Sequence, residues 1–467
     1  MGKLARSATR SLGRGGTAIP GLVAERFDPD VVRSLAAPLE SVVLVTGTTG
    51  KTTTARLLAE ILSADGRPVV HNRAGSNLMR GIAASLLEAV GPLGRLPPDS
   101  VAVFETDEAT IPSAAAAHPP RALVITNLMR DQLDRYGEIE AVRERWVDAI
   151  RRLDQGTVLV LNADDPSVAT LAEVAPGPVV LYGIEDATAA LPLGSDEPQV
   201  ADALWDPQSG IDFVYDRRFY AHLGHWQCPG VGRRRPLPDV RGVGIELDPH
   251  GVVFGIDCGS HAGDGAEEHY GARLSLPGLY NVYNALAAFT AARVLEVAPD
   301  LAAATLGATR AAFGRGEELV LDGHPVRILL GKNPAGTNEA LRTLRPTRGD
   351  APLPLHLLVL LNDDIADGTD ISWIWDTDWE SLAPHVASVV VGGSRAADMA
   401  LRLGYAGFPE PRLAPDDEHD IDAALRGAIE ALPSGEGLVV LPTYTALLEV
   451  RGRLAQWAGL RAIGDGA

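Results

Sequence analysis

The chain has 467 residues, of which 46% are apolar and 22% charged, and its formal net charge is −20. This length exceeds what one hydrophobic core supports, and the composition is that of a folded rather than a disordered chain. The negative charge excludes the usual nucleic-acid binder, which neutralises phosphates with basic residues, so we expect no nucleic-acid partner.

The N-terminal segment, residues 1–38, begins with a basic, weakly amphipathic stretch that lacks the apolar core of a signal peptide. It suits a surface helix, and a helix that touches a membrane is the alternative. No run of about 18 apolar residues predicts a membrane span. The two cysteines, Cys228 and Cys258, are too few for a disulfide framework, so we expect a cytoplasmic protein.

From about residue 40 to 190, short apolar runs alternate with helical stretches, which is typical of a parallel α/β sheet. The predicted strands are 42–45, 101–104, 123–125 and 158–161, with a helix at 139–152. From about 195 to 275 the pattern becomes irregular and rich in Pro, Gly and Arg, up to a helix that opens at 278–281. We interpret this stretch as an inserted subregion.

A second α/β series begins after about residue 315. Its predicted strands lie near 326–330, 355–361, 387–391 and 438–441, and its final helix lies near 444–458. We therefore expect a central domain, 39–313, and a C-terminal α/β domain, 314–467, each with its own core.

The first predicted strand runs directly into a glycine turn and a helix start, because Val42 to Thr54 reads V-V-L-V-T-G-T-T-G-K-T-T-T. Gly47 and Gly50 allow backbone N–H groups to surround an anion at a helix N-terminus. Lys51 can reach terminal phosphates, and the Thr52 hydroxyl suits Mg²⁺. The alternative, a glycine turn with a solvated lysine, is weakened because the chain has only three lysines.

This loop has Val45 where the general P-loop pattern has its first glycine, and the shortened form resembles the Mur ligase and folylpolyglutamate synthase superfamily. The resemblance implies a Mur-type P-loop domain followed by a Rossmann-like one. It also implies ATP and Mg²⁺ as cofactors, a carboxylate activated as an acyl phosphate, and an amine that displaces the phosphate. The implied nucleotide-binding residues are Gly47, Thr48, Thr49, Gly50, Lys51, Thr52, Thr53, Asn281, Asn284 and Arg315.

Glu105 ends a strand where the superfamily places a Mg²⁺-binding glutamate, so the resemblance implies Thr52 and Glu105 as the metal residues; a solvated acidic loop is the alternative. Arg315 matches the arginine that reaches the γ-phosphate from the next domain. With Lys51 it would stabilise the charge that builds up during phosphoryl transfer. Asn281 and Asn284 could otherwise be ordinary helix caps.

Two further segments match the superfamily less completely. Thr126 to Glu138 carries Gln132 in place of the usual histidine, which puts a metal contact there in doubt. Asn162-Ala163-Asp164-Asp165 resembles a motif that helps to close the nucleotide site, although alone it is only a turn.

Segments 71–77, 130–135, 332–336 and, most specifically, 361–376 resemble the MurT family, the ligase subunits of lipid II isoglutaminyl synthases. The resemblance implies that lipid II is the substrate and that the α-carboxylate of its D-glutamate becomes the amide of D-isoglutamine. The ammonia would come from a GatD-like class I glutaminase subunit in a heterodimer.

The resemblance further implies that Asp370 enters the glutaminase and completes a Cys-His-Asp arrangement in trans, since a histidine base works best beside a carboxylate. Trp373 and Trp375 beside it suit an interface. The alternative is a solvated or cation-binding acidic loop, whose residues Asp363, Asp364, Asp367 and Asp370 do not have EF-hand spacing.

MurT proteins of other bacteria carry a four-cysteine zinc ribbon whose two turns match 206–210 and 228–232 here, and Cys228 alone remains of the four ligands. We expect no zinc, because structural zinc needs four such ligands. A site rebuilt from Cys228, His222 and His225 is the alternative.

Two other functions stay open. One is a self-sufficient Mur-type or folylpolyglutamate-type ligase that adds an amino acid, and the other is a non-catalytic nucleotide-binding assembly protein. Lys51, Thr52, Glu105 and Arg315 together argue against the second, because a binding module needs neither the metal carboxylate nor the arginine.

Overall fold

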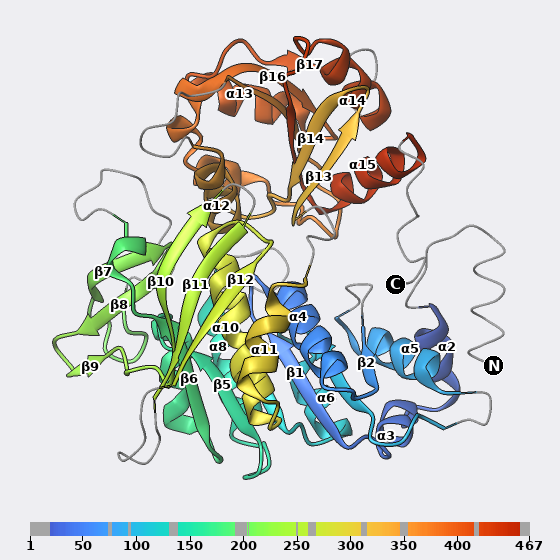
Figure 1. The fold of residues 1–467 in the computed structure, drawn as a ribbon, viewed down its shortest axis with the longest axis vertical. Helices are drawn as coiled ribbons and strands as arrows, with labels where there is room; N and C mark the ends of the chain where they lie inside the picture. The colour runs from blue at the N-terminus through green and yellow to red at the C-terminus, as the bar shows by residue number, and fades with distance from the viewer. Residues whose placement is uncertain are drawn as a thin grey trace.

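The computed structural model of the chain describes residues 19–72, 77–91, 95–129, 139–191, 203, 205–248, 251–259, 268–309, 315–345, 354–414 and 420–457. Their strands form sheets of nine, six and three strands. In Figure 1 the six-stranded sheet and its helices lie above the nine-stranded sheet, and the three-stranded sheet lies at the left edge.

The nine-stranded sheet has the order β12-β11-β10-β6-β5-β4-β1-β3-β2. Strands β1 to β6 and β10 are parallel, and β11 is antiparallel to both of its neighbours. The bounds are β1 Ser41–Thr46, β2 Val69–His71, β3 Val101–Glu105, β4 Ala122–Ile125, β5 Val158–Asn162, β6 Val179–Ile184, β10 Val240–Asp248, β11 Gly251–Cys258 and β12 Glu268–Leu274.

Helices cover both faces of this sheet, which is why its parallel strands read as continuous apolar runs. In β1, Val43 and Val45 enter one core while Val42 and Leu44 enter the other, because successive strand side chains alternate. Helices α4, α10 and α11 contribute to the first core, and α3, α5, α6 and α8 to the second. The helices of this part are α2 Ile19–Phe27, α3 Val31–Ala36, α4 Lys51–Ala64, α5 Met79–Ala89, α6 Ile111–Ala117, α8 Ile139–Ile150, α9 Pro166–Ala169, α10 Leu279–Val294 and α11 Pro299–Leu306, with 3₁₀ turns η1 Thr170–Val174 and η2 Ala187–Ala189.

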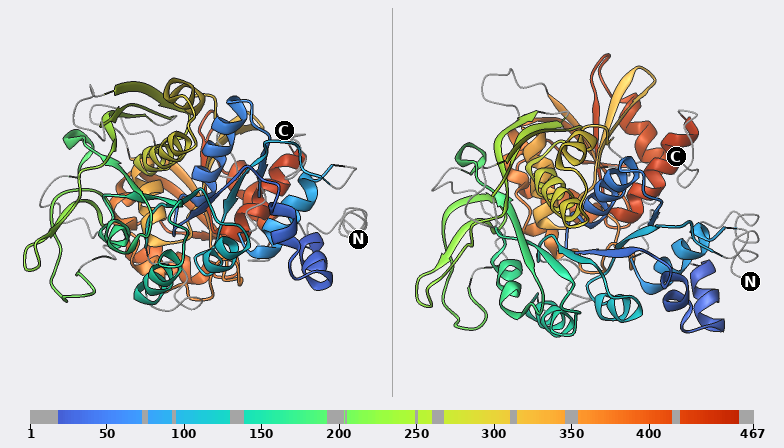
Figure 2. Two further views of the ribbon diagram at one scale, coloured as in Figure 1. Left: turned by 90° about the horizontal axis from the view of Figure 1, so that it is seen from below. Right: turned by 60° about the horizontal axis from the view of Figure 1, so that its bottom comes forward.

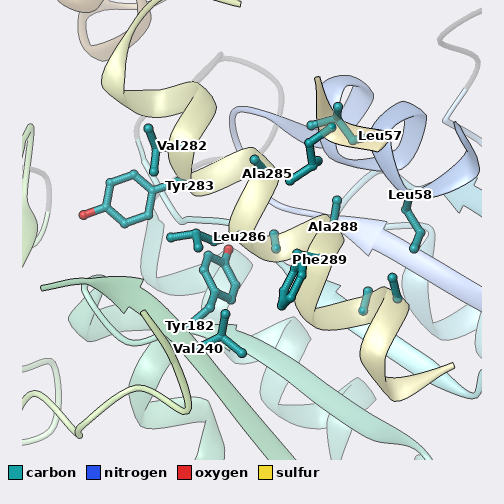
Figure 3. Close-up of a cluster of buried hydrophobic side chains, with 14 of the residues drawn as sticks. Leu57, Leu58, Tyr182, Val240, Val282, Tyr283, Ala285, Leu286, Ala288 and Phe289 are labelled. Carbon is teal, nitrogen blue, oxygen red and sulfur yellow. The ribbon is translucent and has the colours of Figure 1, made fainter. Parts of the chain in front are cut away.

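Helix α10 is buried along most of its length and packs directly against α4 (Figure 3). Its small residues Ala285 and Ala288 face Leu57 and Leu58 of α4. This close packing matters for the site because α4 begins at the phosphate loop and α10 carries the two asparagines predicted to face it.

The stretch from about 195 to 275 was expected to be irregular, but its described residues contain six strands. Strands β7 Val214–Tyr220, β8 Leu223–Cys228 and β9 Arg233–Arg234 form the separate three-stranded sheet, and β10 to β12 extend the central sheet. The expectation was wrong because these strands are partly exposed and rich in Arg and Gly, which hides their alternation. Both views in Figure 2 show β7 to β9 at the edge opposite α2 and α3.

The C-terminal part has a six-stranded sheet of order β13-β14-β18-β15-β16-β17. Separate apolar clusters cover its two faces, so it has its own core. Its strands are β13 Arg315–Leu321, β14 His324–Leu329, β15 Leu355–Leu360, β16 Val386–Gly392, β17 Arg412–Leu413 and β18 Leu438–Pro442. Its helices are α12 Pro334–Leu344, α13 Ala396–Tyr405, α14 Ile421–Glu430 and α15 Tyr444–Trp457, with 3₁₀ turns η3 Ser372–Trp375, η4 Trp379–Ser381 and η5 Ala383–His385.

The predicted parallel α/β architecture is confirmed, and each predicted strand and helix of both series is present within a few residues of its expected bounds. The expected domain boundary between 313 and 314 lies at the edge of residues 310–314, outside the described part of the chain. Among the described helices, none has the length and apolar character needed to cross a bilayer.

Candidate functional site

The phosphate loop joins β1 to α4 and depends on two glycines. Gly47 has φ +130° and Gly50 has φ +83°, a region that disfavours other residues. A Cβ atom on Gly47 would lie 2.1 Å from Thr126 Oγ1, and one on Gly50 would lie 2.0 Å from Asn284 Oδ1. The loop therefore curls tightly at the N-terminus of α4, whose free N–H groups and dipole favour an anion.

The segment after β4 holds the loop in this shape. Thr48 N donates to Asn127 O at 3.0 Å, and Thr49 N donates to Asn127 Oδ1 at 2.9 Å. Thr49 O in turn accepts from Thr126 Oγ1 at 2.7 Å and from Asn127 Nδ2 at 3.2 Å. Thr48 Oγ1 exchanges hydrogen bonds with the backbone of Met129. The loop is thus fixed by the neighbouring strand end as well as by its own glycines.

Lys51 extends along the loop at the first position of α4. Its Nζ donates to Gly47 O and to Thr48 O, and it pairs with Glu108 Oε1 at 2.9 Å. Both charged side chains are largely buried, since 11% and 12% of their surfaces are exposed. The ammonium therefore lies beside the loop carbonyls, where a bound anion would meet it.

Glu105 lies at the end of β3, next to the end of β1, with Val45 as its partner in register. Its backbone exchanges two hydrogen bonds of 2.8 Å with the Asn72 side chain, which fixes the chain at this point. Glu105 is 4% exposed, and its Oε2 atom is buried without a hydrogen-bond partner among the described residues. Such an oxygen is costly unless a cation compensates it, so the donor set fits a hard divalent ion such as Mg²⁺.

The structure brings Asn284 to the loop, 234 residues along the chain from Gly50. Its Oδ1 lies 3.5 Å from Thr54 Oγ1, and its Nδ2 donates to Asn281 Oδ1 at 3.1 Å. Asn281 Nδ2 donates to Pro277 O at 2.7 Å, so Asn281 also acts within its own helix start. Asn284 therefore contacts the loop directly, and Asn281 orients Asn284.

Asp164 and Asp165 follow β5 and are fully buried. Asp165 caps α9 and accepts from Leu128 N at 2.8 Å, next to the segment that holds the loop. Asp164 accepts from Arg235 Nε at 2.6 Å, from the Tyr283 hydroxyl at 2.6 Å and from Ile184 N at 2.9 Å. Both carboxylates thus have protein partners, and Asp165 stabilises the segment that holds the loop.

The electrostatics of this buried network follow from those contacts. Burial alone would lower the pKa of Arg235, but Asp164 and Glu185 raise it above its usual value. Burial, and then Asp164, raise the pKa of Tyr283 well above its usual value. Asp164 therefore keeps a charged partner and a neutral hydroxyl donor at its two oxygens.

Several predicted positions lie outside the described residues. The Arg315 backbone begins β13, opposite Leu329, but its side chain is outside the description. Residues 73–76 and 130–138, which include Gln132, are also outside it.

The loop after β15 carries four aspartates in different environments. Asp363 pairs with Ser394 and Arg395, and the Ser394 hydrogen bond lowers its pKa. Asp367 is buried and accepts from Thr445 N at 2.8 Å, and burial raises its pKa.

Asp364 and Asp370 are exposed instead. Asp370 Oδ1 accepts from Ser372 N at 2.8 Å, which fixes its side chain at the start of η3. Trp375 is 50% exposed and contacts the ring of Tyr405, which is 73% exposed. The exposed Asp370 thus lies a few residues before Trp375, whose exposed ring contacts that of Tyr405.

The two turns that match a zinc ribbon are joined here by other contacts. Asp206 pairs with Arg233 at 2.9 Å, and Cys228 packs with Phe213 and Trp226 in a small apolar cluster. Cys228 Sγ lies 3.7 Å from Ile211 O.

The two histidines that could have rebuilt a metal site are engaged elsewhere. His222 lies 3.3 Å from Asp165, and His225 lies 3.0 Å from Ile184 O. Within the described part of the chain, no group of three or more His, Cys, Asp or Glu side chains could hold a metal ion. The described side chains therefore do not fit a zinc site.

Glu108 and Asn127 were not predicted as site residues, and the structure places both at the loop. Asn127 belongs to the segment from Thr126 to Glu138 that resembles the superfamily, so its place at the loop could have been predicted. Glu108 lies three residues after Glu105 in an acidic run, and the sequence alone does not tell which carboxylate of this run reaches the loop.

Comparison with known proteins adds to this geometry. The family model described as the Mur ligase middle domain matches residues 45–199, and the model described as MurT ligase C-terminal matches residues 330–447. The lipid II isoglutaminyl synthase (glutamine-hydrolyzing) subunit MurT of Streptococcus pneumoniae is 36% identical over 95% of this chain and 93% of its own length. The subunit of the same name from Staphylococcus aureus strain N315 is 31% identical over 96% of this chain and 94% of its own.

Solved structures share the fold at lower identity. A pseudomurein peptide ligase type C from Methanothermus fervidus has a TM-score of 0.64 and 23% identity over 88% of this chain and 77% of its own. The MurF ligase of Thermotoga maritima, solved in complex with ADP, has a TM-score of 0.59 and 14% identity over 91% of this chain and 82% of its own. Both likenesses concern the fold alone.

Proposed function

The chain belongs to the MurT family of Mur-type ligases, and from this premise we propose that it amidates the D-glutamate α-carboxylate of the lipid II stem peptide to give D-isoglutamine. As a family member it is an ATP-dependent ligase of peptidoglycan biosynthesis. The observation that most supports the ATP chemistry of this proposal is the meeting of Lys51, Asn284 and Glu105, whose Oε2 has no partner among the described residues, around one glycine loop.

The proposed reaction has two steps. The substrate carboxylate attacks the γ-phosphorus of ATP, ADP leaves, and an acyl phosphate forms. Ammonia then attacks the acyl carbon and expels inorganic phosphate. The loop N–H groups, Lys51 and Arg315 would stabilise the negative charge on the transferred phosphoryl group. Mg²⁺ held by Thr52 and Glu105 would neutralise phosphate charge. The remaining proposed nucleotide contacts are Thr48, Thr49, Thr53 and Asn281.

We also propose that the ammonia comes from a GatD-like class I glutaminase subunit. The exposed Asp370 in a fixed turn, with exposed Trp375 nearby, supports a contact at this loop. Because the acceptor is lipid-linked and ATP is the energy source, the proposed place of action is the cytoplasmic face of the plasma membrane. The division into 1–38, 39–313 and 314–467 is part of the same proposal.

The test is amidation of lipid II by the full chain with ATP, Mg²⁺ and ammonium, followed by mass spectrometry. Lys51→Ala should lower the rate at least about hundredfold, as expected for a group that stabilises transition-state charge. Arg56→Ala, which removes a cation farther along the same helix, should leave the rate within about twofold, as surface substitutions usually do.

Other outcomes would support the alternatives. Incorporation of a labelled amino acid in place of ammonia would indicate a self-sufficient ligase. ATP binding without ADP formation, with acceptor and glutaminase present, would indicate an assembly protein. Amidation by Lys51→Ala at the unaltered rate would refute the proposal itself.

A further inference from the structure

Helix α12 of the C-terminal part contacts a buried backbone carbonyl of the central part. Arg342 of α12 donates through Nη1 to Phe219 O at 2.9 Å. Phe219 lies near the end of β7 and is completely buried, so its carbonyl is shielded from water. In Figure 1, α12 lies on the side of the C-terminal part that faces the central sheet. The two parts of the chain are thus joined by a hydrogen bond from a charged donor, which is stronger than one between neutral groups.

This carbonyl accepts from outside its sheet because Phe219 is the extra residue of a β-bulge. Its two neighbours in β7 pair with consecutive residues of β8, Leu223 and Gly224, so Phe219 has no partner residue in the ladder. A buried carbonyl that is not paired within a sheet needs another donor, and the Arg342 guanidinium supplies it. The inserted hairpin therefore presents an acceptor whose donor comes from the C-terminal part.

Two further contacts keep Arg342 and α12 in place. Glu339 Oε1, one turn earlier on the same helix, lies 3.6 Å from the Arg342 guanidinium, and the Glu339 side chain is buried. Ala335 at the start of α12 belongs to an apolar core of the nine-stranded sheet, as Phe219 does. Apolar burial is favourable but has no direction, so the hydrogen bond from Arg342 fixes the orientation of α12.

Arg315 is connected to α12 through a short hydrogen-bonded path. Its backbone begins β13 and pairs in register with Leu329, the last residue of β14. Gly331 N then donates to Pro442 O at the end of β18 at 3.0 Å, and α12 begins at Pro334. Because strands and helices are stiff, a shift of α12 relative to the central part also shifts the Arg315 backbone.

We infer that Arg342 is a positioning residue for the ligase reaction, which binds Phe219 O, docks α12 on the central part and so places Arg315 at the phosphate loop. The inference rests on the proposed function, in which Arg315 stabilises the transferred phosphoryl group. Arg342 itself contacts neither ATP nor the acceptor. A misplacement of about 1 Å at Arg315 is enough to lower the rate, because catalysis depends steeply on the geometry of the reacting groups.

The test uses the full chain and measures kcat for ammonium-dependent amidation, together with the Kd for Mg·ATP by calorimetry. Arg342→Met keeps much of the side-chain length but removes the donors, and it should lower kcat about tenfold, as expected for the loss of one charge-assisted hydrogen bond. The Kd should stay within about twofold, because the nucleotide phosphates bind at the phosphate loop. Arg342→Lys keeps a charged donor and should recover part of the lost rate.

Arg345→Met is the matched control. Arg345 directly follows α12 and is almost as exposed as Arg342, but it pairs with Asp378 of the C-terminal part itself at 3.2 Å. This variant should keep kcat within about twofold, as surface substitutions usually do.

A double variant separates positioning from a general structural role. If Arg342 acts through Arg315, Arg342→Met should lower kcat no further in an Arg315→Ala background, whereas independent effects would multiply. The inference is overturned if the two effects multiply, if Arg342→Met is as active as Arg345→Met, or if Arg342→Lys is no more active than Arg342→Met. Each of these results leaves the Lys51→Ala defect in place, so a failure of the inference differs from a failure of the proposed function.

Discussion

Replacing Gly50 with alanine tests the geometry of the phosphate loop, and a glycine beyond the other end of α4 provides a matched control. Gly50 precedes α4 and Gly66 follows it, with φ values of +83° and +84°. A Cβ on Gly66 meets nothing within 4 Å, whereas one on Gly50 would lie 2.0 Å from Asn284 Oδ1. The two substitutions therefore share one backbone strain and differ in one steric contact.

The magnitudes follow from these contacts. A left-handed conformation costs a non-glycine residue about 1–2 kcal/mol, which is the whole expected effect of Gly66→Ala. Gly50→Ala must also displace the Asn284 amide, which contacts Thr54 and donates to Asn281. Two lost hydrogen bonds add about 2 kcal/mol, so Gly50→Ala should destabilise by about 3–4 kcal/mol.

Thermal unfolding monitored by circular dichroism is the assay. For a domain of this size, the extra 2 kcal/mol corresponds to a Tm about 3–4 °C lower for Gly50→Ala than for Gly66→Ala. In an Asn284→Ala background the difference should shrink, because the clash is removed. Equal losses of Tm for the two glycine variants, or a difference that persists without the Asn284 side chain, would refute the proposed contact. ATP binding should weaken in Gly50→Ala and not in Gly66→Ala.

The remaining predictions concern Mg²⁺, the partner and the ribbon. Glu105→Gln should preserve or raise Tm, because it removes the charge of a buried carboxylate whose Oε2 has no partner among the described residues. The variant should need at least about tenfold more Mg²⁺ for half-maximal activity, and an unchanged Mg²⁺ dependence would contradict this role. Asp370→Asn should abolish glutamine-dependent amidation and spare most of the ammonium-dependent rate, and equal loss of both rates would count against a role in the partner. Elemental analysis should find no zinc, and Asp206→Ala should lower Tm more than Cys228→Ser, since Asp206 carries the ion pair with Arg233; one tightly bound zinc per chain would contradict this.

The sequence was sufficient for features that depend on neighbouring residues. The run from Val42 to Thr54 predicted a strand, a glycine turn and a helix, because burial, glycine freedom and helix start all act within a few residues. The strands of both α/β series could be predicted for the same reason, because each is marked by a local apolar run. The inserted stretch was misread because its strands are partly exposed and have no continuous apolar run to mark them.

Only the tertiary structure decided which distant residues meet. Asn284 was predicted near the loop by resemblance, but its contact with Gly50 depends on the packing of α10 against α4. The hydrogen bond from Arg342 to Phe219 O and the ring contact between Tyr220 and Tyr283 join segments that no local pattern relates. The physical reason is that local conformation follows from short-range sterics and solvation, whereas these contacts exist only once separate cores have formed and been brought together.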